Sequence, residues 1–281
     1  MVDIKLKDGS TIPKLGIGSW YLGESRYKKD LEALKTALDI GVTLIDTAEM
    51  YGSGKAEKLI GEAIKDVDRS KLYLVSKVYP HNAGKNNIRK SLLTSMDNMG
   101  VDYLDMYLLH WRGQVPLSET VMCMEELKAE GLIKNWGVSN FDTDDMIELF
   151  NVPNGEKCAL NQVLYHLGSR GVEYSLMPWL KEHNVPLMAY CPMAQGGDLN
   201  RNLLQSKILK SVAQKYDIST QQLLLKFVLE QDNVIAIPRS GNSNHIKENW
   251  YIKDVVISKE DLDILESEFP APSRKTFLDI V

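Results

Sequence analysis

The chain has 281 residues, of which 44% are hydrophobic and 25% are charged, and its formal net charge is −5. These proportions are those of an ordinary globular protein, so we expect a well-formed core without extensive disorder. The negative net charge excludes nucleic acid as the main partner, because nucleic-acid-binding proteins need a broad basic surface. No stretch approaches the ~18 apolar residues of a membrane span, and charges interrupt the N-terminal segment where a secretory apolar run would lie. We therefore expect a cytoplasmic protein with no membrane partner.

In chain order, the first predicted element is a hairpin over residues 4–12, with a Lys-Asp-Gly-Ser turn, which we place over the bottom of a barrel. Segments with helical periodicity follow at 28–38, 56–64, 87–99 and 117–129. Short apolar runs rich in β-forming residues alternate with such segments. There are eight of these runs: KLGIGSW, VTLIDTA, KLYLVSKV, DYLDMYLLH, IKNWGVSN, CALNQV, VPLMAYCP and NVIAIPRS.

Alternation of strand and helix predicts parallel strands, and eight such units nearly fill the chain. We therefore predict a (β/α)₈ TIM barrel that forms a single domain over residues 1–281. A doubly wound sheet is less favoured, because the only glycine signal after the first strand is Gly16-Ile17-Gly18. The long connection between Tyr190 and Arg239 holds two predicted helices, 203–216 and 220–230, and an extra C-terminal helix is predicted at 259–267.

Three polar residues, Asp46, Lys77 and His110, each end a predicted strand, at intervals of roughly 30 residues that match a βα repeat. In such a barrel the carboxyl ends of the strands converge on the active site. Tyr51 follows Asp46 in a loop that contains glycines. We expect the Lys77 charge to lower the pKa of the Tyr51 phenol, which makes Tyr51 a proton donor. Asp46 would hold Lys77 charged, and His110 would polarise a carbonyl oxygen.

The motifs LIDTAEMYG, LVSKV, LLHW and WGVSNF stand in the order typical of the aldo-keto reductase family, and the resemblance runs from about residue 5 to 269. The chain most resembles bacterial members of the methylglyoxal and aldehyde reductase type. The resemblance implies NADPH-dependent reduction of aldehydes or ketones to alcohols. It also implies a catalytic set of Asp46, Tyr51, Lys77 and His110, in which Tyr51 is the general acid and hydride passes directly to the carbonyl carbon.

The resemblance also implies a cofactor site at the ends of the later strands. A cationic side chain, a hydroxyl and a helix N-terminus lie together after the last strand, and these groups suit the 2′-phosphate of NADPH. His245 stands where NADPH-selective relatives often have arginine, so use of NADH as well stays open. The implied contacts are Ser139, Asn140 and Gln162 with the carboxamide, Tyr190 stacked on the nicotinamide, Arg239, Ser240 and Asn242 with the 2′-phosphate, and Glu248 and Asn249 with the adenine.

Trp20 and Trp111 resemble the aromatic walls of the family's substrate pocket. The short tail after the last helix predicts an open cleft, which suits small aldehydes such as methylglyoxal. Two further positions depart from the family pattern. Cys191 replaces a serine, and Arg112 replaces a proline, either to form a salt bridge in its loop or to meet an acidic substrate.

The three cysteines, Cys123, Cys158 and Cys191, are far apart and should be reduced thiols, and the histidines form no HExxH motif, so we expect no metal site. We expect a monomer, with a dimer as the alternative. Two other functions stay open: a lyase that uses Lys77 as a Schiff base, and a regulatory protein that binds the cofactor with negligible turnover.

Overall fold

The structure, a computed structural model, describes residues 2–194 and 203–281 of the chain. Eight parallel strands follow one another around a barrel in the order of the sequence. Two parallel bridges, Leu15 to Ala236 and Gly18 to Arg239, join the first strand of the barrel to the last. The predicted fold class is therefore confirmed. The barrel strands are β3 (Ile17–Gly18), β4 (Leu44–Asp46), β5 (Tyr73–Val78), β6 (Leu104–Leu109), β7 (Ile133–Ser139), β8 (Asn161–Leu164), β9 (Leu187–Tyr190) and β10 (Val234–Ala236).

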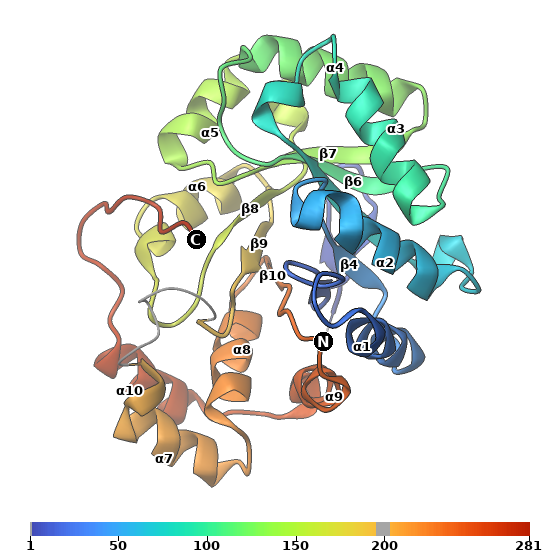
Figure 1. Cartoon of the computed structure of the whole chain (residues 1–281). Helices are drawn as coiled ribbons and strands as arrows, with labels where there is room; N and C mark the ends of the chain where they lie inside the picture. Colours follow the sequence, from blue (N-terminus) through green and yellow to red (C-terminus); the bar gives the residue numbers. More distant parts are fainter. Residues whose placement is uncertain (1, 195–202) are drawn as a thin grey trace.

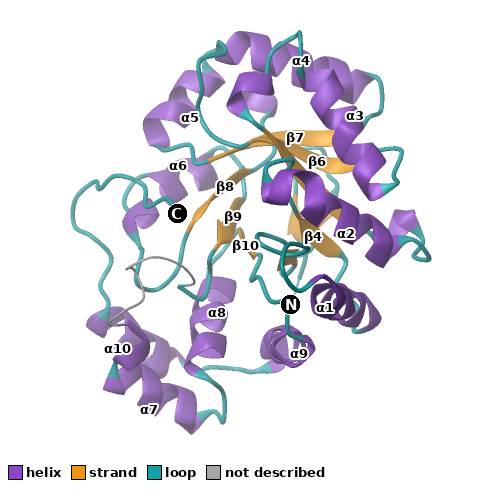
Figure 2. Cartoon of the chain, in the orientation of Figure 1, coloured by secondary structure: helices purple, strands orange, loops and turns teal. Residues whose placement is uncertain are grey.

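Helices surround the strands on the outside of the barrel (Figures 1 and 2). In the part of the chain that the structure describes, no helix is long and apolar enough to cross a membrane. The helices are α1 (Tyr27–Asp39), α2 (Lys55–Ile64), α3 (Ile88–Met99), α4 (Leu117–Ala129), α5 (Thr143–Phe150), α6 (Leu176–Glu182), α7 (Lys207–Lys215), α8 (Thr220–Glu230), α9 (Ser243–Tyr251) and α10 (Lys259–Glu268).

The helix predicted over residues 203–216 starts later than expected. Leu203–Gln205 forms a 3₁₀ turn, and α7 begins at Lys207. The cause is a capping residue that the pattern of apolar residues does not reveal: the Ser206 hydroxyl accepts the Leu209 N–H at 3.2 Å. Part of the long connection before this turn, residues 195–202, lies outside the described residues. The extra C-terminal helix is present as α10.

The N-terminal hairpin closes the amino end of the barrel. Its strands, β1 (Ile4–Lys5) and β2 (Thr11–Ile12), pair antiparallel. Leu6 and Ile12 are buried in one cluster with the inward-facing side chains of the barrel, among them Val75. With this end plugged by apolar side chains, the polar groups at the opposite, carboxyl ends of the strands are left to form the site.

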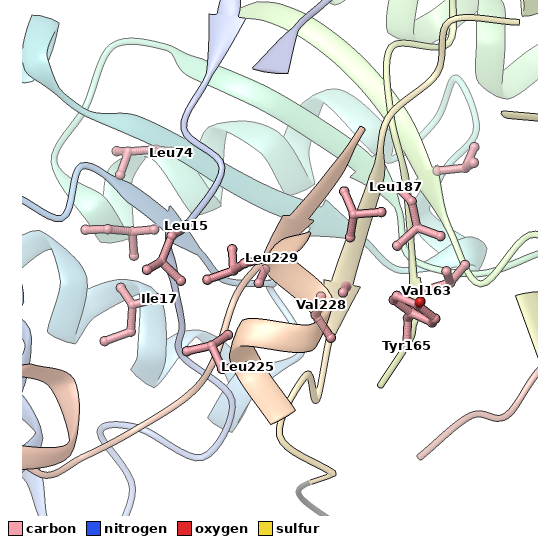
Figure 3. Close-up of a cluster of buried hydrophobic side chains, with 14 of the residues drawn as sticks. Leu15, Ile17, Leu74, Val163, Tyr165, Leu187, Leu225, Val228 and Leu229 are labelled. Carbon is pink, nitrogen blue, oxygen red and sulfur yellow. The ribbon is translucent and has the colours of Figure 1, made fainter. Parts of the chain in front are cut away.

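A second apolar layer fills the space between the strands and the outer helices. Figure 3 shows Leu225, Val228 and Leu229 of α8 directed toward the barrel. Leu15 and Ile17, on the first barrel strand and its approach, belong to the same cluster. Each such side chain contributes about 1.5–3 kcal/mol when it is fully buried. This layer holds the strand ends in fixed positions, and it therefore also fixes the side chains of the site that those strand ends carry.

The C-terminal tail, from whose short length we expected an open cleft, reaches the cavity at the barrel mouth. After α10 the chain runs in a long arc and its end lies beside α6 (Figure 1). Leu278 packs against the core, Asp279 accepts a hydrogen bond from the Ser169 hydroxyl, and Val281 lines the cavity at the barrel mouth. A short tail can therefore still border the cavity at the barrel mouth, because the path of the chain after α10, and not the length of the tail, decides where its end lies.

Candidate active site

A cavity of about 260 Å³ lies at the carboxyl ends of the barrel strands. It brings together side chains from at least five strand ends that are far apart in the sequence. Its lining includes Asp46, Tyr51, His110, Ser139, Asn140, Gln162, Tyr190 and Arg239, all of which the sequence analysis singled out, together with Trp20. Lys77 lies in contact with this set and is fully buried.

The Lys77 ammonium is surrounded by oxygen atoms. Its Nζ donates to both carboxylate oxygens of Asp46, at 2.9 and 2.8 Å, and to the Thr47 carbonyl at 2.7 Å. The Tyr51 hydroxyl lies 3.3 Å from the same nitrogen. These four contacts hold Lys77 as a cation at a fixed position next to Tyr51.

The expectation that the pKa of Tyr51 is lowered was wrong, because other effects outweigh the Lys77 charge. The pKa of Tyr51 lies well above its usual value of 10, because the phenol is buried and because Asp46, Tyr190 and Cys191 also disfavour its charged form. The Asp46 carboxylate offsets the Lys77 charge, so Tyr51 faces a nearly neutral pair. Tyr51 therefore keeps its proton at neutral pH.

Burial acts on both members of that pair. It raises the pKa of the Asp46 carboxyl, against the opposing effect of Lys77, and it lowers the pKa of Lys77, against the opposing effect of Asp46. A further hydrogen bond, from the Gln162 amide to Asp46 at 2.7 Å, favours the carboxylate. The hydrogen bonds from Lys77 to Asp46, together with the one from the Gln162 amide, favour the state in which Asp46 and Lys77 are both charged.

His110 is neutral in this site. Burial, with a smaller contribution from the Lys77 charge, lowers the pKa of His110 to about 2. Its ring lies edge-on to Tyr51, with 5.9 Å between the ring centroids. Among the described residues no group hydrogen-bonds its Nδ1, which is buried. A neutral imidazole beside a phenol can direct a carbonyl oxygen without adding a charge to the cavity.

Amide and hydroxyl groups form one side of the cavity. The Asn140 amide donates to the His110 carbonyl at 3.2 Å, and its oxygen accepts the Tyr190 hydroxyl at 2.8 Å. Asn140 has a φ of 59°, a left-handed conformation that asparagine tolerates. Ser139 donates to the Gln162 carbonyl at 2.8 Å. The structure thus brings the four predicted carboxamide and ring contacts together.

A second cavity, of about 410 Å³, adjoins the first at Arg239, which lines both. Ser240, His245, Glu248 and Asn249 line this second cavity, as the sequence analysis expected of an adenosine site. Asn242 does not line it; its side chain caps α9 by accepting the N–H groups of Asn244 and His245, at 2.9 and 3.4 Å.

The two predicted substrate-pocket tryptophans differ in position. Trp20 lines the first cavity, and its ring stacks on Tyr21 with centroids 4.6 Å apart. Trp111 does not line that cavity; it packs against the His110 ring at 4.8 Å and lies edge-on to Tyr79. Arg112 donates to Glu148 at 2.7 Å. Of the two roles expected for Arg112, a salt bridge or contact with an acidic substrate, the structure shows the salt bridge.

Cys191, the other departure from the family pattern, lines the first cavity, and its backbone has a φ of 51°. Burial raises the pKa of its thiol to about 11. Sequence reasoning missed other parts of the site. The Thr47 carbonyl could not be found from side-chain type, since any residue would supply it. Gly18 and Ile237 line the cavity as ordinary strand residues, with no chemical signal to mark them.

Comparisons with known proteins agree with this geometry. Residues 14–268 match the model of the aldo/keto reductase family. The chain belongs to the aldo/keto reductase family. It is 45% identical over 280 residues to the methylglyoxal reductase YeaE of Escherichia coli (strain K12). The matched residues make up 99% of this chain and 98% of that protein. It is 32% identical over 267 residues to a glyoxal reductase of Bacillus subtilis (strain 168), covering 94% and 91% of the two chains.

Among solved structures, an aldo/keto reductase from Klebsiella pneumoniae in complex with NADP and acetate matches with a TM-score of 0.96 and 46% identity. The match covers 99% of each chain. As an aldo/keto reductase, this protein is an oxidoreductase. In the part of this aldo/keto reductase that the structure describes, no three histidine, cysteine or acidic side chains are grouped to hold a metal ion.

Proposed function

We propose that this aldo/keto reductase reduces small aldehydes or ketones to alcohols with NADPH, and that Tyr51 is the general acid. The observation that carries the proposal is the position of the Tyr51 hydroxyl, 3.3 Å from the buried Lys77 ammonium and on the wall of a cavity shared with His110. A phenol held beside a fixed cation can give up its proton at the moment of reaction, although its resting pKa is high.

The two adjoining cavities fit a dinucleotide. The amides of Asn140 and Gln162 and the Tyr190 ring suit the nicotinamide end, and the second cavity suits the adenosine end. Arg239, which lines the second cavity beside Ser240, and the N-terminus of α9 supply positive charge that suits the 2′-phosphate. A cofactor held by these residues would supply the hydride for the carbonyl carbon. The similar methylglyoxal reductase and the aldo/keto reductase in complex with NADP support the same cofactor and small carbonyl substrates such as methylglyoxal.

Residues of the chain itself supply the proton and stabilise the negative charge that forms during the reaction. His110, as a neutral imidazole, directs the carbonyl oxygen toward Tyr51, and Tyr51 donates its proton to that oxygen as negative charge develops on it. The Lys77 ammonium stabilises the tyrosinate that results, because its Nζ lies within hydrogen-bond distance. Asp46 keeps Lys77 charged and in place through two hydrogen bonds. Trp20 and Tyr21 help to exclude water from the mouth of the cavity.

The contacts of Lys77 argue against the lyase. A Schiff base requires a neutral amine with a free lone pair, whereas Lys77 donates to Asp46 and to the Thr47 carbonyl. Borohydride trapping with a carbonyl substrate and no nicotinamide should therefore leave Lys77 unmodified. The regulatory alternative predicts NADPH binding without turnover, and NADPH oxidation measured against a panel of aldehydes and ketones, repeated with NADH, separates the two.

The direct test of the proposed role is Tyr51→Phe. We expect turnover to fall by at least the ~10²–10⁴-fold that proton transfer contributes, because phenylalanine has no proton to give. The equilibrium affinity for NADPH should stay close to that of the wild type. A matched control is Tyr73→Phe, which removes a buried phenol at the amino end of the barrel. Near-normal turnover in Tyr51→Phe would show that another group is the acid.

A further inference from the structure

A buried carboxylate on α1, Asp30, has no part in the reaction described above. Only 1% of Asp30 is exposed to solvent. Its Oδ2 accepts the backbone N–H of Gly23, in the loop after β3, at 3.0 Å. Its Oδ1 is also buried, and no hydrogen-bond partner for it occurs among the described residues. A buried anion with one oxygen unsatisfied is costly, so its position calls for an explanation.

The unsatisfied oxygen lies against the loop that follows β10. A Cβ atom placed on Gly241 would lie 2.3 Å from Asp30 Oδ1 and 3.2 Å from a guanidinium nitrogen of Arg26. Gly241 sits between Arg239 and Ser240 on one side and the α9 cap, Asn242, on the other. The Asp30 carboxylate therefore touches the backbone of the loop that carries the proposed phosphate contacts, and only glycine leaves it room.

The charge of Asp30 acts on Arg239. Burial lowers the pKa of the Arg239 guanidinium; the Asp30 carboxylate opposes this effect, and Arg26 adds to it. Tyr21 and Glu24, from the loop after β3, also face Arg239. The Arg239 Nε donates to the Trp20 carbonyl at 2.8 Å. Arg239 is thus attached to the loop after β3 by a hydrogen bond, and the Asp30 charge on α1 favours its charged form.

We propose that Asp30 is a positioning residue for the cofactor phosphate, and that it acts by orienting Arg239 and by holding residues 239–242 against the loop after β3. The inference rests on the proposed NADPH-dependent function. Asp30 lies away from the reacting groups, so its effect falls on cofactor affinity and not on the chemical step. NADPH should depend on Asp30 more than NADH does, because only NADPH carries the 2′-phosphate.

The test compares Asp30→Asn with Asp105→Asn. Asparagine keeps the oxygen that accepts the Gly23 N–H and removes only the charge. Asp105 is a matched control, since it is 2% exposed, accepts the Leu74 N–H at 2.9 Å and pairs with Arg69 at 2.7 Å, but lies at the amino end of the barrel. Equilibrium dissociation constants for NADPH and NADH are measured by fluorescence titration, and kcat is measured at saturating cofactor.

For Asp30→Asn we expect an NADPH dissociation constant about tenfold higher, the scale of one charged contact, with kcat nearly unchanged. The NADH constant should change less, and Asp105→Asn should leave both constants as they are. Gly241→Ala gives a second reading, because its Cβ would displace the Asp30 carboxylate and should also weaken NADPH binding. In the protein without cofactor, the backbone amides of residues 239–242 should exchange hydrogen faster in Asp30→Asn than in the wild type, and at the wild-type rate in Asp105→Asn.

The outcomes separate the two proposals. If the wild type binds NADPH and Asp30→Asn binds it equally well, the positioning role is wrong and the proposed function is unaffected. If Asp30→Asn weakens NADPH and NADH by the same factor, its effect is not on the 2′-phosphate and the inference is also wrong. If the wild type does not bind NADPH, both proposals are wrong.

Discussion

At the scale of single residues, the environment decides what each side chain of the site can do. Tyr51, Lys77 and His110 all have pKa values displaced from their usual ones, and burial is the first cause in each case. The shifted pKa values have a different consequence for each residue. Tyr51 keeps its proton, Lys77 is retained as a cation by Asp46, and His110 remains uncharged, so the cavity holds a proton donor next to one neutralised ion pair.

The neutral state of His110 predicts the pH dependence of the reaction. Its pKa lies near 2, below the usual 6.5, so the ring stays uncharged as pH changes through the range from 5 to 8. We expect kcat for carbonyl reduction at saturating substrate to show no ionisation step near pH 6.5. A step of that kind that disappears in His110→Gln would mean that the histidine is charged during the reaction.

At the scale of elements, the start of α5 fixes one side of the cavity. Asp142 and Asp145 form a capping box, in which each side chain accepts the backbone N–H of the other residue, with 2.9 Å from the Asp142 N–H to Asp145. The Asp142 side chain also accepts the Thr143 N–H at 2.7 Å. Asn140, with its left-handed backbone, lies two residues before this cap. The geometry of the cap therefore sets how the chain leaves β7 and where the Asn140 amide lies.

We expect Asp142→Ala to lower the free energy of unfolding by about 1 kcal/mol, because the capping hydrogen bond is lost. The measurement is urea unfolding followed by circular dichroism. Asp144→Ala is the matched control: it removes a charge from the same turn and a contact with Lys275 at 2.7 Å, but it caps nothing, so its effect should be smaller. Equal losses in the two variants would contradict a capping role.

At the scale of the whole molecule, the tail joins the last helix to the barrel mouth. Lys275 pairs with Asp144 of α5, Leu278 packs on the core and Val281 lines the cavity. Tyr190, the proposed nicotinamide contact, lines the same cavity as Val281. The end of the chain thus borders both proposed ligands, although it lies far in sequence from the strands that form the site.

Docking of the tail can be measured by limited proteolysis. We expect Leu278→Ala to speed tryptic cleavage after Arg274 and Lys275, because the variant loses the apolar contact that holds the tail. It should also raise the KM for the carbonyl substrate, since Val281 would leave the cavity wall. Phe277→Ala is the control, because Phe277 is 97% exposed and should anchor nothing. If both variants are cut at the wild-type rate, the tail is held by other contacts.

The sequence by itself determined the barrel and most of the polar side chains of the site. Alternating strand and helix patterns allow few other topologies, and side chains that end parallel strands meet at one edge of the sheet, so Asp46, Lys77 and His110 could be placed together. Only the tertiary structure decided the pKa of Tyr51, the path of the tail, the place of Trp111 outside the cavity and the contact of Asp30 with Gly241. These features depend on burial and on distances between residues remote in the chain, and no local pattern of residues encodes either quantity.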